Sequence, residues 1–168
     1  SEGATELRAL PGYGRAMRVL RLLEVQRARE CIVATCALYD LRFHFTVWYE
    51  DVDLHALATA HGAELLDRIA FHVAMFQLNS VASLRPDAIE LGAYARFATP
   101  RLVALWRTVF KNVWGQWRWQ HQLPDYGGPA FVDAPADAPA AQPVSTARGP
   151  VDWLVFCGGG KDSLVRSE

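Results

Sequence analysis

The chain has few of the features that would place it in a membrane or on nucleic acid. No apolar run approaches the roughly 18 residues that a membrane-spanning helix needs, so a spanning segment is not expected. The net charge of the 168 residues is −1, which gives no general attraction to nucleic acid or to an anionic membrane. Residues 1–4 lack the basic and apolar regions of a signal peptide. We therefore expect a cytoplasmic protein with no nucleic-acid or membrane partner.

Cysteine and histidine are also sparse. The three cysteines are an odd number, which argues against a disulfide framework, and Cys31 and Cys36 are spaced for neither a CxxC redox pair nor a zinc knuckle. We predict both to be buried small hydrophobic residues in a reducing compartment. The five histidines form no HxxxH or HExxH spacing, so no metal ligands are predicted in this chain.

Basic residues gather in one stretch near the N-terminal end. Its members are Arg15, Arg18, Arg21, Arg27 and Arg29. A charge cluster of this kind usually marks a solvated face. We predict such a face here rather than a binding patch.

The first half of the chain carries signals for both strands and helices. Val19 to Leu23 fits either type, whereas Leu41 to Glu50 alternates apolar and polar residues and predicts a half-buried strand in an antiparallel pair. His44 is on the more polar face of that strand, so we predict a surface or cross-strand residue and not a catalyst. Asp53 is a plausible helix N-cap, and Gly62 interrupts the helix that follows.

A second helix is predicted over residues 63–78, with an apolar stripe at helical spacing. The stripe consists of Leu65, Leu66, Ile69, Val73 and Phe76. His72 lies beside it and is predicted to be a core-edge histidine rather than a ligand. Residues 86–91 read as a short strand or an extended link.

A third helix is predicted from Thr99 to about Gln122, because threonine followed by proline is a strong helix start. Its predicted core stripe consists of Trp106, Val109, Phe110, Val113 and Trp117. Trp114 and Trp119 are left over. They either pack between two layers, which aromatic stripes usually do, or form an aromatic surface for a nucleotide-sugar ligand or a following domain.

These elements predict an α+β fold, with antiparallel strands and helices in an N-terminal domain over residues 1–132. Residues 133–150 are mostly Ala, Pro, Gln and Ser, and they predict an interdomain linker. Residues 151–168 are expected to supply the first strand and loop of an α/β nucleotide-binding domain. No internal repeat is visible.

The segment with the clearest chemistry follows the linker. Residues 151–156 (Val-Asp-Trp-Leu-Val-Phe) are typical of a buried parallel strand, and they lead into Cys157 to Ser163, after which a helix is expected to begin. A strand, a glycine-rich turn and a helix start aim successive backbone N–H groups at an anion, and glycine lets phosphate oxygens approach the main chain. Asp162 can cap the helix, and the Ser163 hydroxyl can donate to a phosphate. The predicted ATP- and pyrophosphate-binding residues are Gly158, Gly159, Gly160, Lys161, Asp162 and Ser163.

This loop is neither a GxxxxGK[ST] nor a GxGxxG motif, but it resembles the S-G-G-x-D-S loop of the PP-loop ATP pyrophosphatases. Gly158 stands at the place of the usual serine, while Gly159, Gly160, Asp162 and Ser163 match. The resemblance implies that the loop binds the β,γ-pyrophosphate of ATP while a substrate group attacks the α-phosphorus. The products are then an adenylated substrate and pyrophosphate, with magnesium as the metal.

Within that superfamily the chain looks most like the glutamate epimerases of peptidoglycan synthesis, the MurL family. The similarity rests on 91–96 (Leu-Gly-Ala-Tyr-Ala-Arg), 105–113 (Leu-Trp-Arg-Thr-Val-Phe-Lys-Asn-Val), the Leu-Pro-Asp-Tyr stretch from Leu123 and the loop itself. It implies ATP-dependent inversion of the terminal L-glutamate of UDP-N-acetylmuramoyl-L-alanyl-L-glutamate, in cell wall biogenesis. The sequence assigns no residue as the base that removes the α-proton.

Two alternatives stay open. One is a PP-loop enzyme that modifies tRNA or transfers an amide, against which stand the near-neutral charge and the absence of CxxC pairs. The other is a non-catalytic helical binding module that keeps a vestigial nucleotide loop. Because a PP-loop domain needs further βα units after its loop, we expect residues 1–168 to be a fragment that depends on the remainder of that domain and is inactive alone.

Overall fold

The computed structural model describes residues 16–139. These residues form a mixed sheet with helices, so the predicted α+β class is confirmed for the N-terminal domain. The predicted strand and loop of residues 151–168 lie outside the described residues.

The sheet has five strands in the order β3-β2-β1-β4-β5. Strands β1 (Val19–Arg27), β2 (Cys31–Leu38) and β3 (Leu41–Trp48) form an antiparallel meander. The short strands β4 (Ala88–Glu90) and β5 (Ala130–Phe131) add on the other side of β1, each parallel to its neighbour. The predicted strand after Leu41 is therefore confirmed, and the ambiguous segment after Val19 is the central strand.

A β-bulge in β1 decides which side chains reach the helices. The pairing with β2 shifts between Leu22 and Glu24, so that Leu22 lies opposite Cys36 and Val25 lies opposite Ala34. One extra residue therefore puts Val25 and Arg27 on the same face as Leu22, where strict alternation would put them on the other face. Val25 and Arg27 line the pocket described below.

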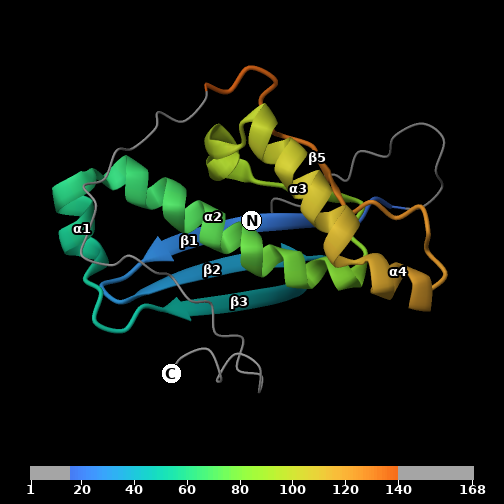
Figure 1. Ribbon diagram of the computed structural model, residues 1–168, viewed down its shortest axis with the longest axis horizontal. Helices are drawn as coiled ribbons and strands as arrows, with labels where there is room; N and C mark the ends of the chain where they lie inside the picture. Colours follow the sequence, from blue (N-terminus) through green and yellow to red (C-terminus); the bar gives the residue numbers. More distant parts are fainter. Residues whose placement is uncertain (1–15, 140–168) are drawn as a thin grey trace, which may run out of the picture.

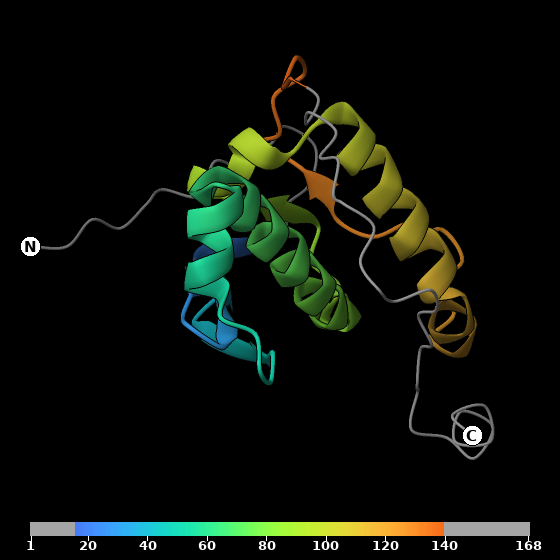
Figure 2. The ribbon, with the colours of Figure 1, turned by 60° about the vertical axis from the view of Figure 1, so that its left-hand side comes forward.

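The helices pack against one face of the sheet. Helix α2 (Ala63–Val81) runs across the strands, α3 (Pro100–Val113) lies beside it, and α1 (Leu54–His61) lies past the end of β1 (Figures 1 and 2). Short 3₁₀ turns, η1 (Ala82–Leu84) and η2 (Gly92–Phe97), flank β4. None of the helices in residues 16–139 is both long and apolar enough to cross a membrane.

The predicted helix starts are confirmed by their hydrogen bonds. The Asp53 carboxylate accepts from the backbone N–H groups of His55 and Ala56 at 2.9 Å, and the Thr99 hydroxyl accepts from Leu102 N–H at 3.2 Å. Gly62 has a φ of 97° and separates α1 from α2. Such a backbone conformation suits glycine because it has no Cβ.

The buried stripe of α2 differs from the predicted one. Leu66 is buried as expected, but Ile69 is 44% exposed and Phe76 is 63% exposed. The residues that face the sheet are instead Ala70, Phe71, Ala74, Met75 and Leu78. Because alanine side chains are small, they suit close packing of the helix on the strands. The buried stripe of α2 therefore includes Phe71 and Met75. Phe76 instead packs edge-on against Trp106 of α3, with ring centroids 5.1 Å apart.

The third helix is shorter than predicted. It ends at Val113, and a separate short helix α4 (Gly115–Gln120) follows after Trp114, whose backbone leaves the helical region. Glycine at 115 weakens helix propensity, and the Trp114 indole N–H donates to the Asn79 side chain of α2 at 3.0 Å. Leu102, Trp106 and Phe110 form the buried face of α3, whereas Val113 is 59% exposed.

The chain after β5 is bound to the sheet domain. One Asp133 carboxylate oxygen accepts from the backbone N–H groups of Leu91 and Gly92 at 2.8 and 2.6 Å. Ala134 packs against the main core. The first residues of the segment predicted as linker therefore contact the folded domain.

Candidate functional site

The predicted phosphate loop, Gly158, Gly159, Gly160, Lys161, Asp162 and Ser163, lies outside the described residues. The described residues contain a second candidate, a pocket that the sequence did not indicate.

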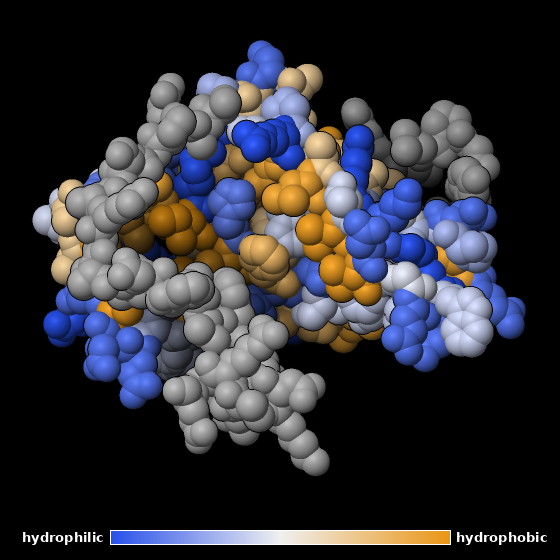
Figure 3. All heavy atoms as spheres, in the orientation of Figure 1, coloured by the Kyte–Doolittle hydropathy of each residue, from blue (hydrophilic) through white to orange (hydrophobic). Residues whose placement is uncertain are grey.

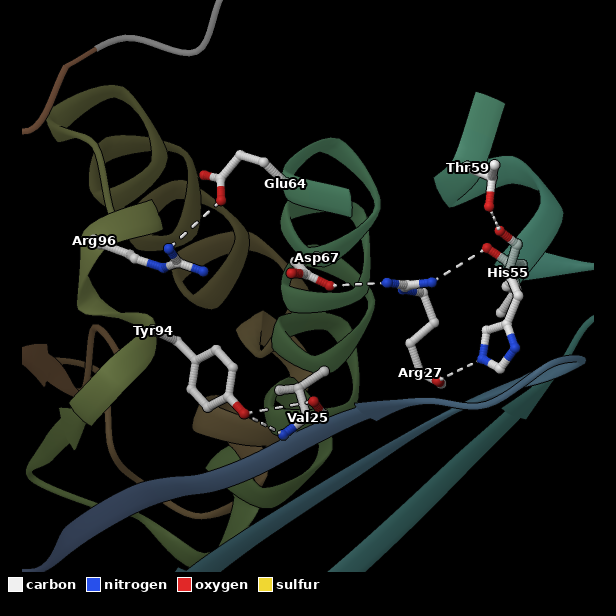
Figure 4. Close-up of polar contacts among 9 residues, drawn as sticks. Val25, Arg27, His55, Thr59, Glu64, Asp67, Tyr94 and Arg96 are labelled. Atoms are coloured by element: carbon white, nitrogen blue, oxygen red, sulfur yellow. Dashed lines mark hydrogen bonds and ion pairs between the residues drawn. The ribbon is translucent and has the colours of Figure 1, made fainter. Parts of the chain in front are cut away.

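The pocket has a volume of about 200 Å³ and lies between the end of β1, the first half of α2 and η2. Its apolar walls come from Val25, Ala70 and Phe97. Its polar walls come from Arg27, Asp67, Tyr94 and Arg96. Figure 4 shows Arg27 reaching from β1 toward Asp67 on α2, while Arg96 turns toward Glu64.

Arg27 is the most enclosed charged residue of this site. Its side chain is 16% exposed, and it donates to Asp67 at 3.4 Å and to the Leu54 carbonyl at 3.2 Å. Within residues 16–139 its buried Nε has no hydrogen-bond partner. A buried donor without a partner is unfavourable by about 1–3 kcal/mol, so such groups are rare unless a ligand or water satisfies them.

Tyr94 and Arg96 come from η2 and form the opposite wall. The Tyr94 hydroxyl accepts from the Val25 backbone N–H at 2.7 Å, which fixes η2 against the strand just after the bulge. The Arg96 guanidinium lies over the Phe97 ring at 4.5 Å, and Arg68 lies over the same ring at 5.0 Å. Two cations therefore contact the same aromatic ring beside the pocket.

The predicted solvated arginine face is wrong for part of its members. Arg18 and Arg27 have side chains only 13% and 16% exposed and pair with Asp87 and Asp67, respectively. Arg29 is 72% exposed, as expected, and pairs with Asp53. Arg27 lies on the opposite face of β1 from Arg21 because of the bulge between them. Arg15 lies outside the described residues.

The predictions for single cysteine and histidine residues agree with the structure. Cys31 and Cys36 are buried, and burial raises the pKa of the Cys36 thiol to about 11, which keeps it protonated and unreactive. His44 pairs across strands with Thr35, with Nδ1 and Oγ1 3.0 Å apart. His72 is half-buried, and burial together with the Arg68 charge lowers its pKa. Between residues 16 and 139, no His, Cys, Asp and Glu side chains cluster in a way that could hold a metal ion.

Of the two left-over tryptophans, only Trp114 packs between layers as the first interpretation predicts. Trp114 packs against the core and bonds to Asn79, whereas Trp119 is 81% exposed. Hydrophobic residues also gather over α2 and α3 on the face shown in Figure 3. The exposed large hydrophobic side chains of these two helices are Ile69, Phe76, Leu105 and Val113.

Comparison with known proteins adds no relative. No family model matches the chain, and neither a curated protein nor a solved structure does.

Proposed function

We propose that this chain is the substrate-side domain and leading phosphate loop of an ATP-dependent epimerase. Its substrate would be UDP-N-acetylmuramoyl-L-alanyl-L-glutamate, and the terminal L-glutamate would be converted to D-glutamate. The single observation that carries the proposal is the sequence Gly159-Gly160-Lys161-Asp162-Ser163 directly after an apolar strand-like segment. That order of residues suits departure of pyrophosphate better than transfer of the γ-phosphate.

The chemistry that such a loop supports fits inversion at an α-carbon. A free carboxylate opposes removal of the neighbouring α-proton, because a second negative charge would develop beside the first. Transfer of the adenylyl group of ATP to the carboxylate oxygen releases pyrophosphate and cancels that charge. A base can then take the α-proton, and a proton delivered to the opposite face gives the other enantiomer. Water then hydrolyses the acyl-adenylate, which releases AMP and restores the free carboxylate.

The proposed roles of the loop residues follow from their chemistry. Backbone N–H groups of Gly158, Gly159 and Gly160 would contact the leaving pyrophosphate, and the Ser163 hydroxyl and Lys161 ammonium would donate to its oxygens. Magnesium would neutralise phosphate charge. The near-neutral charge of the chain favours a small nucleotide-sugar substrate over tRNA.

The test uses the complete protein that contains these residues, with ATP, magnesium and the dipeptide substrate in deuterated water. We expect AMP and pyrophosphate to form only when the dipeptide substrate is present, and deuterium to enter the glutamate α-position as D-glutamate appears. Ser163→Ala should lower both rates at least about tenfold, since a charge-assisted contact to phosphate contributes about 1.5–3 kcal/mol. Asp162→Ala should also lower both rates, because loss of the proposed helix N-cap, about 0.5–2 kcal/mol, loosens the turn that presents the backbone N–H groups. Asp137→Ala, at an exposed site outside the loop, is the matched control.

Two results would contradict the proposal. Formation of ADP and orthophosphate would show that the loop serves γ-phosphate transfer. Stimulation of pyrophosphate release by tRNA, with the dipeptide ignored, would replace the epimerase with a tRNA-modifying enzyme.

A further inference from the structure

The ion pairs around the pocket are looser than the ion pairs elsewhere in the described chain. The N–O distances are 3.4 Å for Arg27 and Asp67, 3.5 Å for Arg96 and Glu64, and 3.8 Å for Arg68 and Glu64. Arg18, Arg21 and Arg29 instead approach their carboxylate partners at 2.8–2.9 Å. Charge-assisted hydrogen bonds usually lie at about 2.7–2.9 Å, so the pocket arginines retain unused capacity to donate.

The charges at this site do not cancel. Arg27, Arg68 and Arg96 bring three positive charges, and Glu64 and Asp67 bring two negative charges, which leaves one positive charge. The Arg27 Nε is buried without a partner among residues 16–139. An anion in the pocket would balance the charge and could accept from the terminal guanidinium nitrogens of Arg27 and Arg96, whose present ion pairs are long.

The size of the pocket limits what the anion can be. A drug-sized ligand needs a cavity of about 300–1,000 Å³, whereas this pocket holds about 200 Å³. It therefore accepts one small group of a larger ligand and not a whole nucleotide sugar. Val25, Ala70 and Phe97 give it apolar walls beside the two guanidinium groups, which suits a carboxylate on a short aliphatic stem.

We infer that this pocket binds the side-chain carboxylate of the terminal glutamate, with Arg27 and Arg96 as its partners. The inference rests on the proposed function, in which the α-carboxylate is adenylated at the loop. The second carboxylate of the same residue then needs a separate anion-binding site. Arg27 and Arg96 would thereby select glutamate over glutamine, because an uncharged amide cannot balance the positive charge of the pocket.

The first experiment measures binding without turnover. The complete protein is titrated with glutarate, with its monoamide and with inorganic phosphate, and thermal stabilisation and the NMR signals of Tyr94 and Phe97 are followed. Glutarate should stabilise the protein and shift these signals, while the monoamide should bind at least about tenfold more weakly. Arg27→Gln and Arg96→Gln should each abolish the difference in affinity between glutarate and its monoamide. Arg107→Gln, at an exposed position of α3, should keep it.

The second experiment measures selectivity in the reaction. The ratio of kcat/KM for dipeptide substrates that end in glutamate and in glutamine should fall at least about tenfold in Arg96→Gln, mainly through KM. Arg96 is 60% exposed, so this variant should fold even if removal of the enclosed Arg27 prevents folding.

The outcomes separate this inference from the proposed function. A folded Arg96→Gln variant that still distinguishes glutamate from glutamine as well as the unchanged protein does would overturn the inference. The proposed epimerase function would still stand. Stabilisation by phosphate that exceeds stabilisation by glutarate would also overturn it, in favour of a phosphate site. A third result would be glutarate binding that depends on Arg96 in a protein that never releases pyrophosphate. It would support the carboxylate pocket and would reject only the proposed function.

Discussion

Gly128 is the residue whose identity the fold constrains most directly. Its φ is +92°, and a Cβ placed on it would lie 2.5 Å from Cβ and 2.7 Å from Cγ of Phe110. Phe110 is only 1% exposed in the main core, and its Cβ is fixed by the α3 backbone. The loop before β5 can therefore pass α3 at this point only without a side chain.

We expect Gly128→Ala to lower the free energy of unfolding by about 2–4 kcal/mol, because overpacking and a strained backbone act together. Urea denaturation followed by tryptophan fluorescence measures the effect. Gly127→Ala is the matched control, since nothing lies within 4 Å of its added Cβ, and it should change stability by no more than about 0.5 kcal/mol. Equal stability of the two variants would mean that the loop moves away from Phe110 without loss.

The pocket shows why its individual residues could not be assigned to a binding site from the sequence. Arg27, Asp67 and Arg96 are far apart in the chain, and no fixed spacing relates them. Arg27 faces the helices only because of the bulge after Leu22. The phosphate loop, in contrast, is contiguous, so its residues could be proposed directly from Gly158 to Ser163.

Among the elements, α3 has the clearest start signal in the chain. The Thr99 hydroxyl accepts from Leu102 N–H, and Pro100 occupies the first turn, where its missing N–H removes no helical hydrogen bond. The helix carries Leu102, Trp106 and Phe110 into the core. Its start therefore contributes to the stability of the whole domain.

Thr99→Ala should lower the free energy of unfolding by about 1 kcal/mol, as expected for loss of an N-cap, while Thr99→Ser should restore most of it. Thr108→Ala is the control, because Thr108 is exposed within the same helix and its hydroxyl only bonds back to the Ala104 carbonyl. Alanine favours the helix interior, so this variant should be neutral or slightly more stable. If both alanine variants lose equal stability in denaturant titrations, the cap contributes nothing specific.

The elements were predictable where a local pattern decides them. The alternation after Leu41 and the caps at Asp53 and Thr99 identified β3, α1 and α3. The buried face of α2 was not predictable, because hydrophobicity favoured Ile69 and Phe76 whereas close approach to the sheet favours Ala70 and Ala74. Phe76 contacts Trp106 of another helix. The hydrophobic periodicity of α2 alone cannot predict that contact.

In the part of the chain that the structure describes, the buried contacts lie within one continuous stretch. Both clusters of buried residues draw on positions between Leu20 and Phe110, and Phe131 and Ala134 pack against the larger cluster. The Asp133 carboxylate binds the backbone N–H groups of Leu91 and Gly92, so the chain after β5 is tied to the turn that begins η2. Without that carboxylate, the N–H of fully buried Leu91 would lose its acceptor.

We expect residues 16–139, produced alone, to fold and to unfold in one cooperative thermal transition. A shorter chain that ends at 132 lacks Asp133, and the unsatisfied N–H groups should lower its Tm by at least about 5 °C, as expected for a loss of roughly 1–3 kcal/mol in a domain of this size. A chain that ends at 136 keeps Asp133 and is the matched control, so its Tm should be close to that of 16–139.

Within 16–139, Asp133→Ala should reproduce the loss, while Asp133→Asn should recover part of it because its amide oxygen can still accept. Calorimetry on the five chains measures these differences. Equal melting of the chains that end at 132 and 139 would place the edge of the folded domain before Asp133.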